Sequence, residues 1–259
     1  MAGSLKSSSD GSTLVLTLSN PDFRNALGPE IYAAGVEALN AAENNPDVRS
    51  VVITGEGANF CAGGNLQRLQ ANRELPQDVQ TQSINGLHSW IDSIRTFPKP
   101  VIAAVEGAAA GAGFSLALAC DFVVAADNAV FVMAYSSVAL SPDGGGSWAL
   151  SRALPRALVT ELLMCGERIG AGRLQALGIV NRCVVAGDAL NEALKLADTL
   201  NARAPNVLAS IKELINDAAG NTLNEQLTSE QMHFVRNLHD ANAGEGIDAF
   251  LNKRTPQYR

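Results

Sequence analysis

Two short glycine-rich segments constrain the fold of this chain more than any other feature. Residues 60–66 have the sequence FCAGGNL, and residues 106–113 have the sequence EGAAAGAG. Each follows a β-type apolar run, at 51–54 and 101–105, and each leads into a helical pattern. Backbone with small side chains beside a helix start presents free N–H groups, which stabilise an oxygen anion or a phosphate. If both segments direct an N–H at one oxygen, they form an oxyanion hole.

Composition excludes several classes of protein. The 259 residues suffice for one substantial domain with a small appendage. With 47% hydrophobic and 17% charged residues, the chain is predicted to be globular rather than disordered. A formal charge of −7 argues against a nucleic-acid partner. No apolar run reaches the roughly 18 residues of a membrane span, so we expect no membrane partner either.

The cysteines and the N-terminus suggest a cellular compartment. None of the four cysteines forms a C-x-x-C pair, so neither a disulfide framework nor a metal site is expected. Residues 1–12 are rich in serine and glycine, and no apolar segment follows them. We expect this start to be frayed and not to be a secretory signal, which favours a cytoplasmic protein.

Strand and helix patterns alternate through the first part of the chain. Strands are predicted at 13–18, 48–54, 101–105, 122–125, 130–133 and 182–185, and helices at 29–44, 77–97 and 114–120. This alternation favours a layered α/β core. Later residues have helical patterns at 188–202, 205–218, 224–238 and 246–253. We therefore divide the chain into a core, 1–200, and a helical region, 201–259, which serves as a lid or an oligomerisation element.

Several linked motifs resemble one known family. They lie at residues 20–27, 60–66, 99–107, 119–121 and 178–180, in the order and spacing of the enoyl-CoA hydratase/isomerase (crotonase) family. The resemblance extends from about residue 14 to the C-terminus. It implies a crotonase-like spiral of ββα units with a C-terminal helical trimerisation region, assembled as a homotrimer or a dimer of trimers. It also implies an acyl-CoA thioester as substrate and no separate cofactor, since coenzyme A is part of the substrate.

The resemblance assigns the two oxyanion donors to the backbone N–H groups of Gly64 and Ala112. A thioester that becomes an enolate needs donors directed at its carbonyl oxygen. Removing one such donor raises the barrier by about 3–4 kcal/mol. The alternative is that both segments are tight turns that let helices pack.

The resemblance also implies coenzyme A contacts. They fall on Arg24, Ala26, Ala62, Asn65 and Leu66. A guanidinium suits phosphate geometry, although a solvated loop arginine is the alternative for Arg24. Asn65 stands where the family commonly has Asp, and either side chain can cap the following helix. Lys253 and Arg254 stand where the family often brings cations to coenzyme A, but we favour a solvated tail.

The chain departs from the family where typical hydratases carry two glutamates. Those positions are held here by Ser115 and Tyr135. A serine hydroxyl is far too weak an acid or base alone, and a tyrosine with an ordinary pKa near 10 is neutral at pH 7. Tyr135 is therefore expected to donate a hydrogen bond or orient a water. Two-glutamate hydration is not expected.

One carboxylate is in the right neighbourhood. Asp143 lies eight residues after Tyr135, where isomerases of the family place an Asp that moves protons on the acyl chain. Apolar flanking residues would raise the pKa of Asp143 toward a range useful for acid/base chemistry. The alternative is a helix N-cap, where the helix dipole would lower the same pKa. The two roles do not exclude each other.

The leading hypothesis is an acyl-CoA hydratase/isomerase-type enzyme that stabilises a thioester enolate, with Asp143 as acid/base. Its resemblance is to the branch that degrades phenylacetate-type aromatic compounds, including oxepin-CoA hydrolases, and fatty acyl-CoA degradation is also possible. A second hypothesis is an aryl-CoA hydrolytic dehalogenase, with Asp143 as nucleophile and His88 activating water. A third is a non-catalytic protein that binds coenzyme A, because both glutamates are missing.

Overall fold

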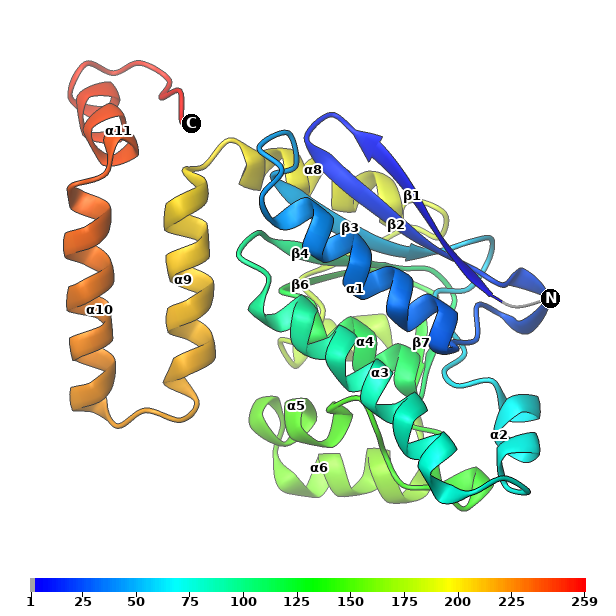
Figure 1. The fold of residues 1–259 in the computed structure, drawn as a ribbon. Coiled ribbons are helices and arrows are strands. Elements are labelled where there is room, and N and C mark those ends of the chain that lie inside the picture. Colours follow the sequence, from blue (N-terminus) through cyan, green and yellow to red (C-terminus); the bar gives the residue numbers. More distant parts are fainter. Residues whose placement is uncertain (1–2) are drawn as a thin grey trace.

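A six-stranded sheet forms the centre of the computed structural model, which describes residues 3–259 (Figure 1). In spatial order its strands are β1 (Ser4–Asp10), β2 (Thr13–Ser19), β3 (Ser50–Gly55), β4 (Val101–Val105), β6 (Phe122–Ala126) and β9 (Arg182–Val184). β1 and β2 are antiparallel, and every later pair is parallel. A three-stranded sheet contains β5 (Ala108–Ala110), β7 (Val130–Val132) and β8 (Arg168–Gly170). The predicted α/β class is confirmed.

Helices cover both faces of the six-stranded sheet. α1 (Pro29–Glu43) and α3 (Gln77–Thr96) pack together on one face, and α8 (Ala189–Asn201) packs on the other. Side chains of β3 alternate between these layers, since Val51 joins the α1–α3 core whereas Val52 joins the α8 core. The shorter elements are η1 (Pro21–Phe23), α2 (Leu66–Asn72), α4 (Ala112–Ala119), η2 (Ser136–Val138), α5 (Gly146–Ala153), α6 (Arg156–Thr160), η3 (Glu161–Cys165) and α7 (Ala171–Ala176).

The prediction of a frayed N-terminus is wrong for most of residues 1–12. β1 pairs with β2 along its full length, from Ser4 opposite Ser19 to Asp10 opposite Thr13. Most β1 side chains are exposed, so this edge strand is held by backbone pairing and lacks an apolar pattern. Met1 and Ala2 lie outside the described residues.

Three helices after α8 stand beside the rest of the molecule in Figure 1: α9 (Pro205–Ala218), α10 (Leu223–Leu238) and α11 (Ala241–Leu251). α9 is attached to the body by Lys212, whose Nζ lies 2.8 Å from Asp121 Oδ2. A second contact comes from Asn216 on α9, whose Oδ1 accepts a hydrogen bond from Arg95 Nη2 on α3 at 2.8 Å. Among residues 3–259, none of the helices combines the length and apolar character required to cross a membrane.

Local caps set the starts of the last two helices. Thr222 and Glu225 form a capping box at the N-terminus of α10. α11 begins at Ala241 instead of the predicted residue 246, because Asp240 caps it by accepting a hydrogen bond from Asn242 N at 2.8 Å.

The contact between α1 and α3 depends on Gly35. A Cβ at this position would overlap the fully buried indole of Trp90. We expect Gly35→Ala to lower the free energy of unfolding by about 1–3 kcal/mol, the usual cost of overpacking a core. Urea denaturation measures the effect. Gly172→Ala in α7 is the matched control, because nothing lies within 4 Å of its added Cβ; equal losses in both variants would contradict this packing.

Candidate active site

The two glycine-rich segments lie side by side, joined by backbone hydrogen bonds. Cys61 N donates to Ala108 O at 3.0 Å, and Ala110 N donates to Cys61 O at 2.8 Å. Phe60 N donates to Glu106 O at 2.7 Å. Segments that are far apart in the sequence therefore form one short parallel ladder at the end of β3 and β4, where the glycine segments leave the sheet.

Glycine is required for this close approach. Gly63 has a φ of +91°, and a Cβ there would lie 2.7 Å from Ala110 O and 3.4 Å from Ala112 N. On the other segment, a Cβ at Gly113 would lie 2.7 Å from Cys61 Cβ. The absence of side chains thus brings the backbone of Gly63 next to the first residue of α4.

Two backbone N–H groups remain available at this junction. Gly64 forms a parallel bridge with Leu27 in which Leu27 N donates to Gly63 O and Asn65 N donates to Leu27 O, so the N–H of Gly64 itself faces away. Ala112 is the first residue of α4, where N–H groups have no partner within the helix. Within residues 3–259 neither group donates to a protein acceptor. Such a pair is chemically suited to stabilising an oxygen anion.

Asp143 and Tyr135 form a hydrogen-bonded pair close to α4. Tyr135 Oη donates to Asp143 Oδ1 at 2.6 Å, and Ser115 Oγ donates to the backbone oxygen of Asp143 at 2.9 Å. Ser115 is buried in α4, one turn after Ala112. A Cβ at Gly111 would lie 3.5 Å from Tyr135 Cζ, so the phenol ring lies over the start of the same helix.

Electrostatics keep the Tyr135 phenol neutral. Burial, followed by the charge of Asp143, raises the pKa of Tyr135 above its usual value near 10. The side chain is therefore a hydrogen-bond donor throughout the physiological range, in the donor role predicted for it. The structure thus places both predicted oxyanion donors, Tyr135 and Asp143 around one helix terminus.

The alternative role of Asp143 as a helix cap is wrong. α5 has Gly145 at its N-cap position and no side-chain cap. Gly144 and Gly145 have φ values of +60° and +78°, and these two left-handed residues separate the carboxylate from the helix. The Asp143 side chain instead accepts the Tyr135 hydrogen bond.

The residues implied to contact coenzyme A surround the first glycine segment. Arg24 O accepts a hydrogen bond from Ala62 N at 2.9 Å, which holds the Arg24 loop beside this segment. Ala26 is buried next to Leu27, and Leu66 is 58% exposed. Within residues 3–259 the Arg24 side chain forms no ion pair and is exposed, so it is free to contact a phosphate.

The capping prediction for Asn65 is confirmed, whereas the solvated tail predicted for Lys253 and Arg254 is wrong for Arg254. Asn65 caps α2 by accepting a hydrogen bond from Arg68 N at 3.1 Å, which confirms the capping prediction. Arg254 pairs with Glu245 and Asp248 at 2.6 Å each, so this cation is occupied within the C-terminal region. Lys253 is exposed at the end of α11.

Within residues 3–259, His88 forms no hydrogen bond or ion pair with Asp143. It is exposed on α3, whereas its neighbour Leu87 is fully buried and lies 3.5 Å from the point that a Cβ on Gly144 would occupy. The dehalogenase hypothesis requires a histidine near Asp143, and this geometry does not support it. Across residues 3–259, no cluster of three or more His, Cys, Asp or Glu side chains is arranged to hold a metal ion.

Sequence reasoning missed Tyr32 and Arg68, which belong to α1 and α2. Burial, followed by the charge of Asp143, raises the pKa of Tyr32, and the charge of Arg68 lowers it. Tyr32 therefore lies within electrostatic reach of the candidate acid/base. The only signal in the sequence was a tyrosine on an otherwise apolar helix face.

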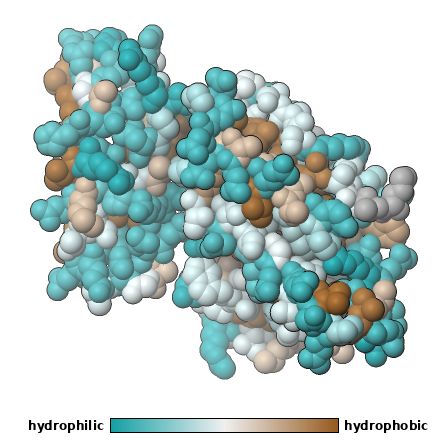
Figure 2. Space-filling view, in the orientation of Figure 1, coloured by the Kyte–Doolittle hydropathy of each residue, from teal (hydrophilic) through white to brown (hydrophobic). Residues whose placement is uncertain are grey.

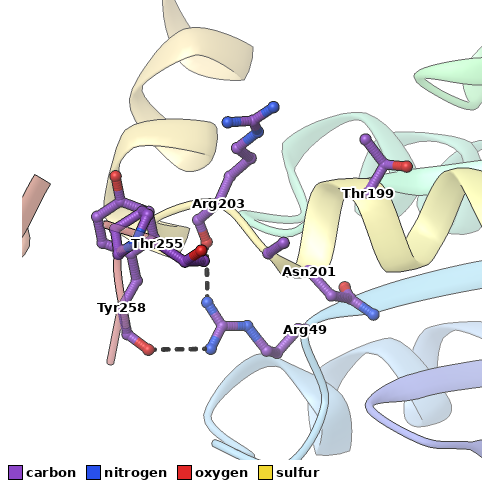
Figure 3. A pocket seen from close by; sticks show the side chains of 8 residues that line it. Arg49, Thr199, Asn201, Arg203, Thr255 and Tyr258 are labelled. Carbon is purple, nitrogen blue, oxygen red and sulfur yellow. Dashed lines mark hydrogen bonds between the residues drawn. The ribbon is translucent and has the colours of Figure 1, made fainter. Parts of the chain in front are cut away.

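A cavity of about 300 Å³ lies elsewhere, between the end of α8 and the C-terminal segment (Figure 3). Arg49 crosses it, donating to Arg203 O at 2.8 Å and to Tyr258 O at 3.4 Å. None of its lining residues belongs to either glycine segment. These hydrogen bonds join the loop before β3 to the residues after α8 and to the C-terminal segment, so we assign this cavity a structural role.

Comparison with known proteins places the chain among acyl-CoA enzymes. A family model described as enoyl-CoA hydratase/isomerase matches residues 8–259. The chain is 36% identical to 1,2-epoxyphenylacetyl-CoA isomerase of Escherichia coli K12 over 246 residues, covering 95% of this chain and 94% of the relative. It is 35% identical to carnitinyl-CoA dehydratase of the same strain over 269 residues, covering 100% and 99%.

Two solved structures show the same fold. An enoyl-CoA hydratase from Polaromonas sp. JS666 is 77% identical, with a TM-score of 0.99 over 99% of this chain and 100% of that one. An enoyl-CoA hydratase from Mycobacterium smegmatis is 30% identical, with a TM-score of 0.92 over 98% of each chain. The fold implied by the sequence motifs is confirmed.

Proposed function

The chain belongs to the enoyl-CoA hydratase/isomerase family, and we propose that it stabilises the enolate of an acyl-CoA thioester between the N–H groups of Gly64 and Ala112. The observation that carries the proposal is the pair of free backbone donors beside the hydrogen-bonded Asp143 and Tyr135. In this proposal the thioester oxygen accepts from both donors, and negative charge grows there as a proton leaves the acyl chain.

Asp143 is proposed to carry that proton. Its carboxylate takes a proton from one carbon of the acyl chain and returns it to another, while the Tyr135 phenol holds one carboxylate oxygen in place. A single carboxylate is suited to isomerisation, because the same group accepts and delivers the proton. The similarity to a 1,2-epoxyphenylacetyl-CoA isomerase supports an isomerase of acyl-CoA thioesters from aromatic or fatty acid degradation.

Hydrogen exchange tests this function without knowledge of the natural acyl group. The protein is incubated in D₂O with straight-chain and aryl-substituted acyl-CoA thioesters, and deuterium at the carbons beside the thioester is measured by mass spectrometry. We expect incorporation for at least one thioester. Tight binding of coenzyme A thioesters without exchange or turnover anywhere in the panel would support the non-catalytic alternative and overturn the proposal.

We also propose assembly as a homotrimer or a dimer of trimers through the C-terminal helices. Along α10, Leu223, Leu227, Phe234 and Leu238 recur at spacings of four and seven residues, which aligns them on one side of the helix. All four are exposed, and apolar patches appear on the outer edge of the C-terminal helices in Figure 2. An exposed apolar stripe of this kind is typical of a protein interface.

A charge in this stripe is expected to weaken assembly. Phe234 is 69% exposed in the single chain, so Phe234→Glu removes no core contact, but it would bury a carboxylate in the proposed interface. We expect the mass in solution, measured by analytical ultracentrifugation, to shift toward the monomer. Thr228→Glu is the control, since Thr228 is exposed on α10 outside the stripe. Identical masses for both variants and the unmodified protein would contradict this interface.

A further inference from the structure

One face of α3 borders the candidate site. Ser83, Gly86 and Leu87 are spaced to lie on the same side of the helix, and both Ser83 and Leu87 are buried. Leu87 Cδ2 lies 3.5 Å from the point that a Cβ on Gly144 would occupy, so the C-terminal end of this face meets the loop that carries Asp143.

The same face meets two polar side chains that the mechanism above does not use. Arg68 Nη2 donates to Ser83 Oγ at 3.0 Å. A Cβ at Gly86 would lie 3.5 Å from Tyr32 Cδ2, so the tyrosine ring lies against the helix where it has no side chain. Ser83 precedes Leu87 by about one helical turn, or about 6 Å. Arg68 therefore lies roughly one turn from the Asp143 loop along α3.

The Tyr32 hydroxyl is unpartnered and open. The residue as a whole is 6% exposed, and within residues 3–259 its hydroxyl forms no hydrogen bond. Within the same residues, two side-chain polar atoms lack a hydrogen-bond partner and are also shielded from solvent, namely Trp90 Nε1 and Asn201 Oδ1. The Tyr32 hydroxyl is not one of them. The hydroxyl of Tyr32 is therefore accessible despite its buried ring, as expected for a group that faces a binding space.

Arg68 has unused hydrogen-bonding capacity. Its guanidinium is half-buried and, within residues 3–259, forms no ion pair with any carboxylate. Glu30 on α1 is exposed, and its Oε2 and Arg68 Nη1 lie 3.2 and 3.4 Å from the point that a Cβ on Gly28 would occupy, but the two side chains form no ion pair. A guanidinium has five N–H donors and binds a carboxylate through two parallel hydrogen bonds. One of these donors is used by Ser83, which leaves four N–H donors of the guanidinium for a ligand.

We propose that Arg68, assisted by the Tyr32 hydroxyl, binds a carboxylate at the far end of the acyl group. The substrate class is then an acyl-CoA thioester that carries a second, ionised carboxyl group beyond the reacting carbons. This inference rests on the proposed function, because it takes the acyl chain to lie along α3 with its thioester end at Gly64 and Ala112. It adds a specificity determinant that the two glycine segments do not supply.

Binding of matched thioesters tests the inference. Three saturated acyl-CoA thioesters of equal chain length, ending in a methyl, a carboxylate or a quaternary ammonium group, are compared by isothermal titration calorimetry. We expect the carboxylate to bind about tenfold or more tightly than the methyl compound, from charge-assisted hydrogen bonds, and the ammonium compound to bind most weakly. Arg68→Met is expected to abolish this order, and Arg68→Lys to restore part of it.

Arg73→Met is the matched control, because Arg73 is an exposed arginine at the end of the same helix. It should keep the full preference for the carboxylate, and circular dichroism melting checks that all variants are folded. Equal affinities for the three thioesters, or a preference that survives in Arg68→Met, would overturn the inference. The saturated thioesters need no turnover, so these results are independent of Asp143. Conversely, absence of exchange in D₂O with an intact carboxylate preference would overturn only the proposed function.

Discussion

Replacing Asp143 with Asn is expected to lower kcat by about 10²–10⁴-fold, the usual contribution of a positioned acid/base. The Asn side chain has the same size as that of Asp. Its amide oxygen can still accept the hydrogen bond that Tyr135 Oη donates to Asp143 Oδ1 at 2.6 Å. It cannot take a proton from the acyl chain. The loss should therefore fall on kcat, with the dissociation constant for a saturated acyl-CoA retained, because the oxyanion donors are untouched.

Rates of deuterium exchange and of turnover measure this effect. Asp127→Asn is the control. Asp127 is an exposed turn residue that precedes β7, so this substitution makes the same chemical change away from the site. An Asp143→Asn variant that exchanges and turns over as fast as the Asp127→Asn variant would show that another group moves the proton.

The second large effect is expected for Gly63→Ala. The added methyl would meet Ala110 O at 2.7 Å and Ala112 N at 3.4 Å, in a backbone conformation with φ of +91°. The two glycine segments must then separate, which misdirects one or both oxyanion donors. Loss of one donor lowers kcat by about 10²–10³-fold, so we expect a reduction of at least this size.

Gly57→Ala separates this effect from backbone strain. Gly57 also has a positive φ, of +75°, but nothing lies within 4 Å of its added Cβ. Both variants should lose stability in a thermal melt, since alanine is strained in this conformation. Only Gly63→Ala should also lose exchange activity. Equal kcat in the two variants would refute a shared oxyanion hole.

Much of the fold could be predicted because helices and strands that pack in the core have recognisable patterns of apolar residues in the sequence. β4 was predicted at residues 101–105 and forms there, since a strand covered on both faces is continuously apolar. β1 was missed for the opposite reason. Its side chains are mostly exposed, so its place at the sheet edge is determined by hydrogen bonds to β2, which leave no pattern in side-chain chemistry.

At the site, local sequence allowed two roles for Asp143 and could not choose between them. An Asp before glycines and a helix fits a cap as well as an acid/base. The choice depends on the left-handed turn at Gly144 and Gly145 and on the contact with Tyr135, which belong to the folded chain. No sequence pattern pointed to Arg68, because its proposed role depends on a hydrogen bond to Ser83 that joins α2 to α3.

The sequence by itself determined the two glycine segments, their place after β-type runs, and the absence of the two glutamates of ordinary hydratases. Those features are local, since they depend on which residues adjoin one another. Only the tertiary structure decided that Gly64 and Ala112 both keep free N–H groups at one junction, beside Asp143 and Tyr135. The reason is physical: a backbone donor is free or occupied according to which distant strand pairs with it, and no residue type records that partner.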